Sequence, residues 1–273
     1  MKNIYTFGGQ PAKRAITIAE MRAAKGKTKL VQVTANTADE ARAVEEAEID
    51  MLVCDAANVH TVRSANTTSF VTAAVKMTEH ATTDDIMREA FRVLHLGADA
   101  IITPRSFHVV ETLAREDIPV MGHLGLVPRK SIWVGGMRAV GKTAEEATEL
   151  YRNFKRLEDA GAFAVECEVI AGEVMAEISK RTSLLTSSLG SGKGADIIFL
   201  FMNDLCGETS HAPRHARRFG DLGKIHEQLY RARVDALSAF RDATVDGQFP
   251  GDAETPSAAP NELDRFRTVL NSL

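Results

Sequence analysis

The stretch Ile118-Pro119-Val120-Met121-Gly122-His123-Leu124-Gly125-Leu126-Val127-Pro128 has the pattern of a buried strand that runs into a loop. Its apolar run ends abruptly at a Gly-His-Leu-Gly turn, so an ionisable imidazole stands where the strand meets solvent. Strand ends that face a cleft are where α/β enzymes place their reacting groups. The stretch therefore predicts an α/β fold with His123 close to a cleft.

Strand-like and helix-like segments alternate on both sides of this stretch. The expected strands start near Leu30, Met51, Phe70, Ala100, Pro119, Phe163, Leu184 and Ile197. A long expected helix runs from Lys142 to Asp159 and carries its apolar residues on one face. Eight alternating strands within about 200 residues favour a (β/α)8 TIM barrel over a doubly wound sheet. The connection from Asp55 to Phe70 is short for a parallel crossover, so the topology there stays open.

A single barrel domain is expected over residues 1–273, with ends that differ from the alternating middle. An N-terminal leader with one helix is expected over about residues 1–28, and a C-terminal helical tail over about residues 213–273. The tail combines a basic helical region, Pro213 to Ala243, with a Pro/Ala/Ser-rich stretch, Gly247 to Pro260. No internal sequence repeat is evident beyond the strand and helix alternation.

The composition narrows the class of protein. With 44% hydrophobic and 26% charged residues, a chain of 273 residues can bury a sizeable core. The net charge of -4 argues against a protein built mainly to bind nucleic acid. Three widely separated cysteines without zinc-ligand spacing indicate a reduced, cytoplasmic setting. Neither a signal peptide nor a membrane span is expected, because no apolar window is long enough.

Three ionisable residues stand at the ends of expected strands: Asp55, His123 and Glu168. In a barrel these ends share one mouth, so the three side chains can converge. Asp55 can bind a divalent cation or cap the following helix, and His123 can contact a ligand or serve as a hydrogen-bonded structural residue. Glu166 and Glu168 share one face of their strand. Two unpaired buried carboxylates are costly, so at least one should have a partner or a function.

Further motifs extend the pattern around His123. They are Gly135-Gly136-Met137-Arg138-Ala139-Val140-Gly141-Lys142, Leu157-Glu158-Asp159-Ala160-Gly161-Ala162 followed by Glu168, Leu189-Gly190-Ser191-Gly192, and Ile49 to Asp55. Together with Pro119 to Pro128, these segments resemble the ketopantoate hydroxymethyltransferase family over about Ile16 to Asp252. The resemblance implies a (β/α)8 barrel of the phosphoenolpyruvate mutase and isocitrate lyase superfamily. It also implies a homo-oligomer, usually a decamer.

The resemblance further implies an enzyme of pantothenate biosynthesis. Such enzymes transfer a hydroxymethyl group from the cosubstrate 5,10-methylenetetrahydrofolate to a small 2-oxo acid, 3-methyl-2-oxobutanoate, through an enolate. They use Mg²⁺ to bind the 2-oxo acid and to stabilise that enolate. By matched position, Asp55 is expected in the metal shell, Glu168 as the general base at C3, and His123 as a substrate-binding residue. Neither nucleic acid nor a membrane is expected as a partner.

The chain departs from the family pattern at the other metal positions. Ala56 stands where the family has the serine that follows its first aspartate. The second metal aspartate falls on Ala74 or, in another alignment, on Pro104. The lysine and glutamate of a further motif fall on Ile102 and Pro104. Of the expected metal carboxylates, only the one at Asp55 is therefore retained.

Two cations close to these positions suggest a different way to bind the substrate. Lys76 and Arg105 can bind a carboxylate without a metal. Two alternatives to hydroxymethyl transfer therefore stay open. One is a diverged lyase or aldolase that acts on another 2-oxo or related carboxylic acid, and the other is a catalytically silent barrel that binds a carboxylate.

Overall fold

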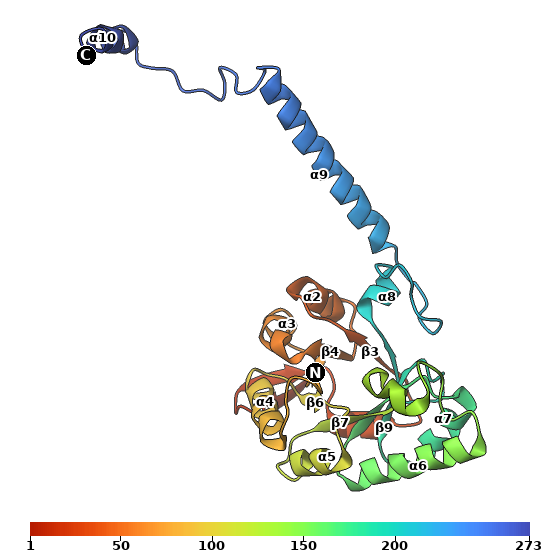
Figure 1. Cartoon of the computed structure of the whole chain (residues 1–273). Coiled ribbons are helices and arrows are strands. Elements are labelled where there is room, and N and C mark those ends of the chain that lie inside the picture. The colour runs from red at the N-terminus through yellow and green to blue at the C-terminus, as the bar shows by residue number, and fades with distance from the viewer. The chain divides into compact units, whose positions relative to one another are not determined.

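Eight parallel strands close into a barrel in the computed structural model, which describes all residues from 1 to 273. The strands are β3 (Leu30–Thr34), β4 (Met51–Asp55), β5 (Phe70–Ala74), β6 (Ala100–Ile102), β7 (Val120–Gly125), β8 (Ala164–Glu168), β9 (Leu185–Leu189) and β10 (Ile197–Leu200). Each strand pairs with the next one in the chain, and β10 pairs with β3 to close the ring. The predicted (β/α)8 barrel is confirmed, and the eight expected strands are those that form it (Figure 1).

Helices surround this barrel. They are α1 (Ile18–Ala24), α2 (Ala38–Glu46), α3 (Val59–Ala65), α4 (Thr83–His95), α5 (Phe107–Ala114), α6 (Ala144–Asp159), α7 (Gly172–Ser179) and α8 (Met202–Cys206). Short 3-10 turns, η1 (Ala56–Asn58) and η2 (Pro128–Val134), follow β4 and β7. Threonine side chains fix several of the helix starts: Thr37 caps α2 and Thr82 caps α4, each within a capping box.

The short connection between β4 and β5 forms a regular crossover. It contains η1 and α3, whose Val59 and Val62 are buried in the core. The two strands pair in parallel from Met51 with Phe70 to Asp55 with Ala74. A helix of seven residues is therefore enough to return the chain to the bottom of the barrel.

The two ends of the chain differ in part from what the sequence pattern predicts. The leader forms an antiparallel hairpin of β1 (Lys2–Tyr5) and β2 (Pro11–Arg14) before α1. The chain divides into two compact units, Met1–Gly220 and Asp221–Leu273. The second unit holds α9 (Leu222–Val245) and α10 (Glu262–Leu270), both within the residues for which a helical tail was expected. None of the helices combines the length and the apolar composition that a membrane span requires.

Strand alternation sorts the side chains of the barrel into two apolar cores. On β8, Val165 and Cys167 pack between the strands and the helices, whereas Ala164 belongs to the core inside the barrel. Glu166 and Glu168 have the same parity as Ala164, so they also face inward. By the same rule Asp55 follows Met51 and Val53, which line the interior. The acidic side chains thus point into the barrel at its C-terminal end.

Candidate active site

A cavity of about 550 Å³ lies at the C-terminal ends of the barrel strands. Its volume falls within the range of small-molecule sites. Apolar side chains such as Val53, Ile102 and Phe199 form its floor, and polar side chains from several strand ends and loops surround it. The polar lining residues are Thr34, Asn36, Asp55, Lys76, His123, Arg129, Glu166, Asn203, Asp204 and Thr209.

An imidazole and two carboxylates form a cluster on one side of this mouth. His123 Nε2 lies 3.0 Å from Oε2 of Glu168 and 3.7 Å from Oε1 of Glu166. The parallel pairing of β7 with β8 sets these distances, because it places His123 opposite Glu166 and Gly125 opposite Glu168. All three side chains are close to fully buried. The imidazole N–H can therefore donate a hydrogen bond to Glu168, the residue that the resemblance predicts to be the general base.

Burial and charge shift the proton equilibria of this cluster. Burial alone favours the neutral imidazole, but the charge of Glu166 and the hydrogen bond to Glu168 outweigh it and raise the pKa of His123. Burial raises the pKa of Glu166; the charge of His123 opposes this shift, and that of Glu168 adds to it. The raised pKa values mean that His123 and Glu166 retain their protons to higher pH than the same groups in water, which suits an acid–base site.

Two glycines of β7 stand where close contacts leave no room for a side chain. A Cβ at Gly122 would lie 2.5 Å from the Leu157 side chain of α6, so glycine lets β7 and α6 approach closely. Gly125 has a φ of +94°, and a Cβ there would lie 2.3 Å from the Glu168 carbonyl oxygen. That oxygen accepts a hydrogen bond from Leu126 N–H at 2.8 Å. Gly122 therefore lets β7 pack against α6, and Gly125 lets the end of β7 approach the backbone of Glu168.

The residue after Glu168 has an uncommon backbone conformation. Val169 has a φ of +49°, in the left-handed region that a β-branched residue rarely adopts. Its N–H donates to Leu189 O, and its carbonyl oxygen accepts from Val140 N–H. These bonds on both sides hold the strained turn in place. Strain of this kind tends to concentrate at functional sites.

A salt bridge occupies the opposite side of the mouth. Lys76 Nζ lies 3.3 Å from Oδ2 of Asp55 and 3.5 Å from Oε1 of Glu79. Asp55 N–H in turn donates to Oδ1 of Asn36 at 2.8 Å, which fixes the end of β4. The hydrogen bond to Asp55 and the charges of Asp55 and Glu79 raise the pKa of Lys76. Lys76 is therefore an ammonium group throughout the neutral pH range.

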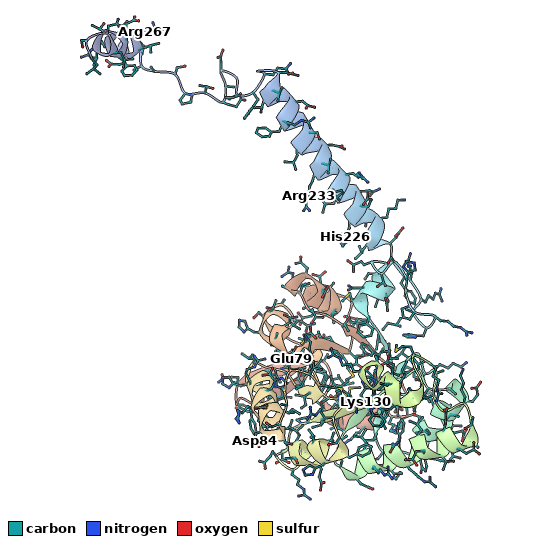
Figure 2. The ribbon with its side chains drawn as sticks, in the orientation of Figure 1. Glu79, Asp84, Lys130, His226, Arg233 and Arg267 are labelled. Atoms are coloured by element: carbon teal, nitrogen blue, oxygen red, sulfur yellow. The ribbon has the colours of Figure 1, made fainter.

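Two loops that border the cavity carry further cations. Lys130 follows β7, and Glu79, the second ionic partner of Lys76, follows β5; both are labelled in Figure 2. Arg105 is not among the lining residues; its guanidinium donates to the carbonyl oxygens of Met77, His80 and Ala81. Lys130 donates to the carbonyl oxygen of Pro104. Both side chains thus support the loops.

The structure brings most of the predicted site residues together. Asp55, Lys76 and His123 line the cavity, and Glu168 contacts His123. Arg129 also lines it and donates to Oγ1 of Thr78 at 2.8 Å. No sequence pattern singled out Arg129, because its place depends on the path of the η2 turn.

The groups around Asp55 do not fit a magnesium ion. Mg²⁺ requires near-octahedral oxygen ligands and is usually bound through one or two carboxylates. The neighbouring strand-end positions hold Ala74, Ile102 and Pro104, and the ionic partner of Asp55 is an ammonium group. A second set of possible ligand atoms, on His123, Glu166 and Glu168, lies within 4.8 Å of one another. Its mixed nitrogen and oxygen donors suit transition metals better than Mg²⁺.

The fold and the cavity define a (β/α)8-barrel protein with an acid–base cluster at the C-terminal ends of its strands. Solved structures share this fold. The barrel is similar to phosphoenolpyruvate phosphomutase from Streptomyces platensis subsp. rosaceus, with a TM-score of 0.51 and 14% identity over 94% of this chain and 99% of that one. A putative phosphonomutase from Burkholderia cenocepacia J2315 gives a TM-score of 0.53 and 10% identity over 81% of this chain and all of that one.

Sequence comparison identifies the family within this fold. Residues 56–252 match the family model of ketopantoate hydroxymethyltransferase. The 3-methyl-2-oxobutanoate hydroxymethyltransferase of Hyperthermus butylicus is 31% identical over 95% of this chain and 96% of its own length. That of Pyrobaculum islandicum is also 31% identical, over 83% of this chain and 94% of its own. The chain belongs to the ketopantoate hydroxymethyltransferase family, which confirms the resemblance found in the motifs.

Proposed function

We propose that this protein enolises a small 2-oxo acid at the barrel mouth and transfers a hydroxymethyl group to it, with Glu168 as the general base. The observation that carries this proposal is the 3.0 Å contact between His123 Nε2 and Glu168 Oε2 beside the cavity. A carboxylate held in this way has a fixed position beside the cavity, which suits a general base. Family membership supports the substrate class, and the resemblance implies the cosubstrate, 5,10-methylenetetrahydrofolate.

The proposed reaction has two stages, enolisation of the 2-oxo acid and formation of a carbon–carbon bond. The Glu168 carboxylate takes the proton from C3 of 3-methyl-2-oxobutanoate, and the electron pair passes into the enolate. C3 then bonds to the methylene carbon of the cosubstrate, whose bonds to N5 and N10 break, and water supplies the hydroxyl group. The second proton of that water and the proton taken by Glu168 pass to the two nitrogens, and tetrahydrofolate leaves. His123 orients the base and balances its charge through the hydrogen bond. Lys76 binds the substrate carboxylate, and Arg105 supports the loop that follows Lys76 through its bonds to backbone carbonyls.

Proton exchange at C3 tests the enolisation step without the cosubstrate. The wild-type protein should exchange the C3 proton of 3-methyl-2-oxobutanoate for deuterium in D₂O, as followed by NMR. Glu168→Gln should slow this exchange by about 10²-fold to 10⁴-fold, the usual contribution of a general base. Glu177→Gln, an exposed change on α7, is the matched control and should leave the exchange rate unaltered. Absence of exchange in the wild-type protein would contradict the proposal.

A second candidate function is a lyase or aldolase for another 2-oxo or related carboxylic acid. The apolar residues Ala74 and Ile102 at the strand ends favour it, because they stand where the resemblance places catalytic polar groups. Exchange at C3 without any product from 5,10-methylenetetrahydrofolate would select this alternative. Binding of a 2-oxo acid without exchange would instead select a silent carboxylate-binding barrel.

A further inference from the structure

We propose that the Lys76 ammonium group takes the place of the divalent cation, so that this barrel binds its 2-oxo acid without a metal. The inference rests on the proposed function for the class of ligand, a small 2-oxo acid. It concerns a different property of the site, namely the source of positive charge. Magnesium fits the surroundings of Asp55 poorly, because the ionic partner of this carboxylate is an ammonium group.

The position of Lys76 follows from the pairing of β4 with β5. Asp55 ends β4 opposite Ala74, and Lys76 comes two residues after Ala74 along the chain. This offset brings Nζ to 3.3 Å from Oδ2 of Asp55, inside the cavity that His123 and Glu166 also line. A second carboxylate, Glu79, holds the same ammonium group at 3.5 Å. Lys76 is thus fixed from two sides at the mouth.

The charges around Asp55 favour an ammonium group over a metal ion. Mg²⁺ bound to Oδ2 at about 2.1 Å would stand within roughly 5 Å of Nζ, where the two cations would repel each other. Ala74 and Ile102 offer no further carboxylate to offset that repulsion. Lys76 already pairs with both Asp55 and Glu79, so neither carboxylate is left without a cationic partner. The local donor set therefore suits a monovalent organic cation.

One side of the cavity then binds the anionic substrate, and the other side accepts the proton. Lys76 and Arg129 are the lysine and arginine side chains that line it, and both follow strand ends, β5 and β7. The cluster of His123, Glu166 and Glu168 supplies the groups that accept protons. A 2-oxo acid with its carboxylate and keto oxygen toward Lys76 presents its C3 carbon to the carboxylates. Positive charge at the developing enolate oxygen stabilises the transition state.

Calorimetric titration of the full chain with oxalate tests the inference. Oxalate is a planar dianion that resembles the enolate of a 2-oxo acid. With EDTA present, the wild-type protein should bind oxalate, and added Mg²⁺ or Mn²⁺ should change the dissociation constant by less than twofold. Lys76→Met should weaken binding at least tenfold, and Lys76→Arg should retain most of it. Lys142→Met, which alters a lysine outside the cavity, should bind as the wild type does.

Two results would overturn the inference. One is oxalate binding that appears only with a divalent cation, whichever residues hold that ion. The other is unchanged affinity in Lys76→Met, with a melting temperature that shows the variant to be folded. Failure of the proposed function looks different, because oxalate would still bind in EDTA while the C3 proton of the 2-oxo acid would not exchange. Metal-dependent exchange that requires Glu168 would remove only the inference about Lys76.

Discussion

Glu166 places a second carboxylate beside the imidazole of His123, on the same inward face of β8 as Glu168. The residue is 7% exposed, so its charged form has little contact with water. The His123 ring, at 3.7 Å, is its ionic partner. The free energy of unfolding should therefore depend on pH through the protonation of Glu166 and His123.

Replacement of Glu166 by glutamine should flatten the dependence of stability on pH. The pKa values of Glu166 and His123 are both raised from ordinary values of 4.5 and 6.5. A raised pKa contributes stability that is present below the unfolded value and is lost as pH rises through the folded value. The free energy of unfolding of the wild type should therefore fall as pH rises from 5 to 9, and Glu166→Gln should lose less.

Urea denaturation across that pH range measures the effect. Glu177→Gln is a suitable control, because hydrogen bonds and charges from Lys180 and Arg181 lower the pKa of Glu177 to about 2. Its titration lies below the range, so its curve should run parallel to that of the wild type. A parallel curve for Glu166→Gln as well would show that Glu166 does not contribute in this way.

Strand parity explains how much of the site the sequence could predict. Asp55 and Glu168 end β4 and β8, and His123 lies within β7, which continues to Gly125 through the segment expected as a turn. All three have inward parity, and the motifs around them identify the family. Arg129 and the contacts of Arg105 depend on the paths of irregular loops, which have no periodic pattern to read. The contact between His123 and Glu166 could not be predicted from either strand alone, because it depends on the register between β7 and β8.

The barrel strands and the N-terminal hairpin differ in how clearly the sequence predicts them. Barrel strands such as β4 and β6 are buried, so their apolar runs indicate strands. The hairpin strands β1 and β2 are mainly exposed and polar, and so carry no alternation that marks a strand. The hairpin is held instead by Arg14, a buried residue at its end that contacts Asp99 before β6.

Asp99 joins three elements at the N-terminal end of the barrel. Its carboxylate accepts from Arg14 Nε at 2.7 Å, from Arg63 Nη2 at 2.7 Å, and from Val71 N–H at 2.9 Å. Burial lowers the pKa of Arg63 to about 10, although the charge of Asp99 opposes this shift. The residue lies away from the cavity. It should thus contribute to stability and not to ligand binding.

Asp99→Asn should lower the free energy of unfolding by about 3–5 kcal/mol, because it leaves two buried guanidinium groups without their partner. Oxalate affinity should stay within twofold of the wild type. The matched control is Asp39→Asn, which breaks an exposed pair with Arg42 and should cost about 1 kcal/mol or less. Urea denaturation measures both changes. Equal losses in the two variants would remove the stabilising role assigned to Asp99.

At the scale of the whole molecule, the second compact unit, Asp221–Leu273, exposes many apolar side chains on its helices. Neither α9 nor α10 contains a buried residue. Leu237 is 68% exposed and Phe240 is 56% exposed, and Ile225 and Leu229 add to the apolar surface of α9. A helix is stabilised in water mainly by packing its apolar face against another surface. The family resemblance implies a homo-oligomer, so we expect a second copy of this chain to supply that surface.

Light scattering on the full chain tests this expectation. The measured mass should be a multiple of 29.7 kDa, with a decamer expected from the family resemblance. Leu237→Glu and Phe240→Glu should each lower that mass, because a charge on the apolar face opposes its burial. Ser238→Glu is the control, since Ser238 lies on the opposite side of α9 from Phe240 and should leave the mass unchanged. A monomeric wild-type protein at micromolar concentration would refute self-association, and equal masses for all variants would place the contact elsewhere.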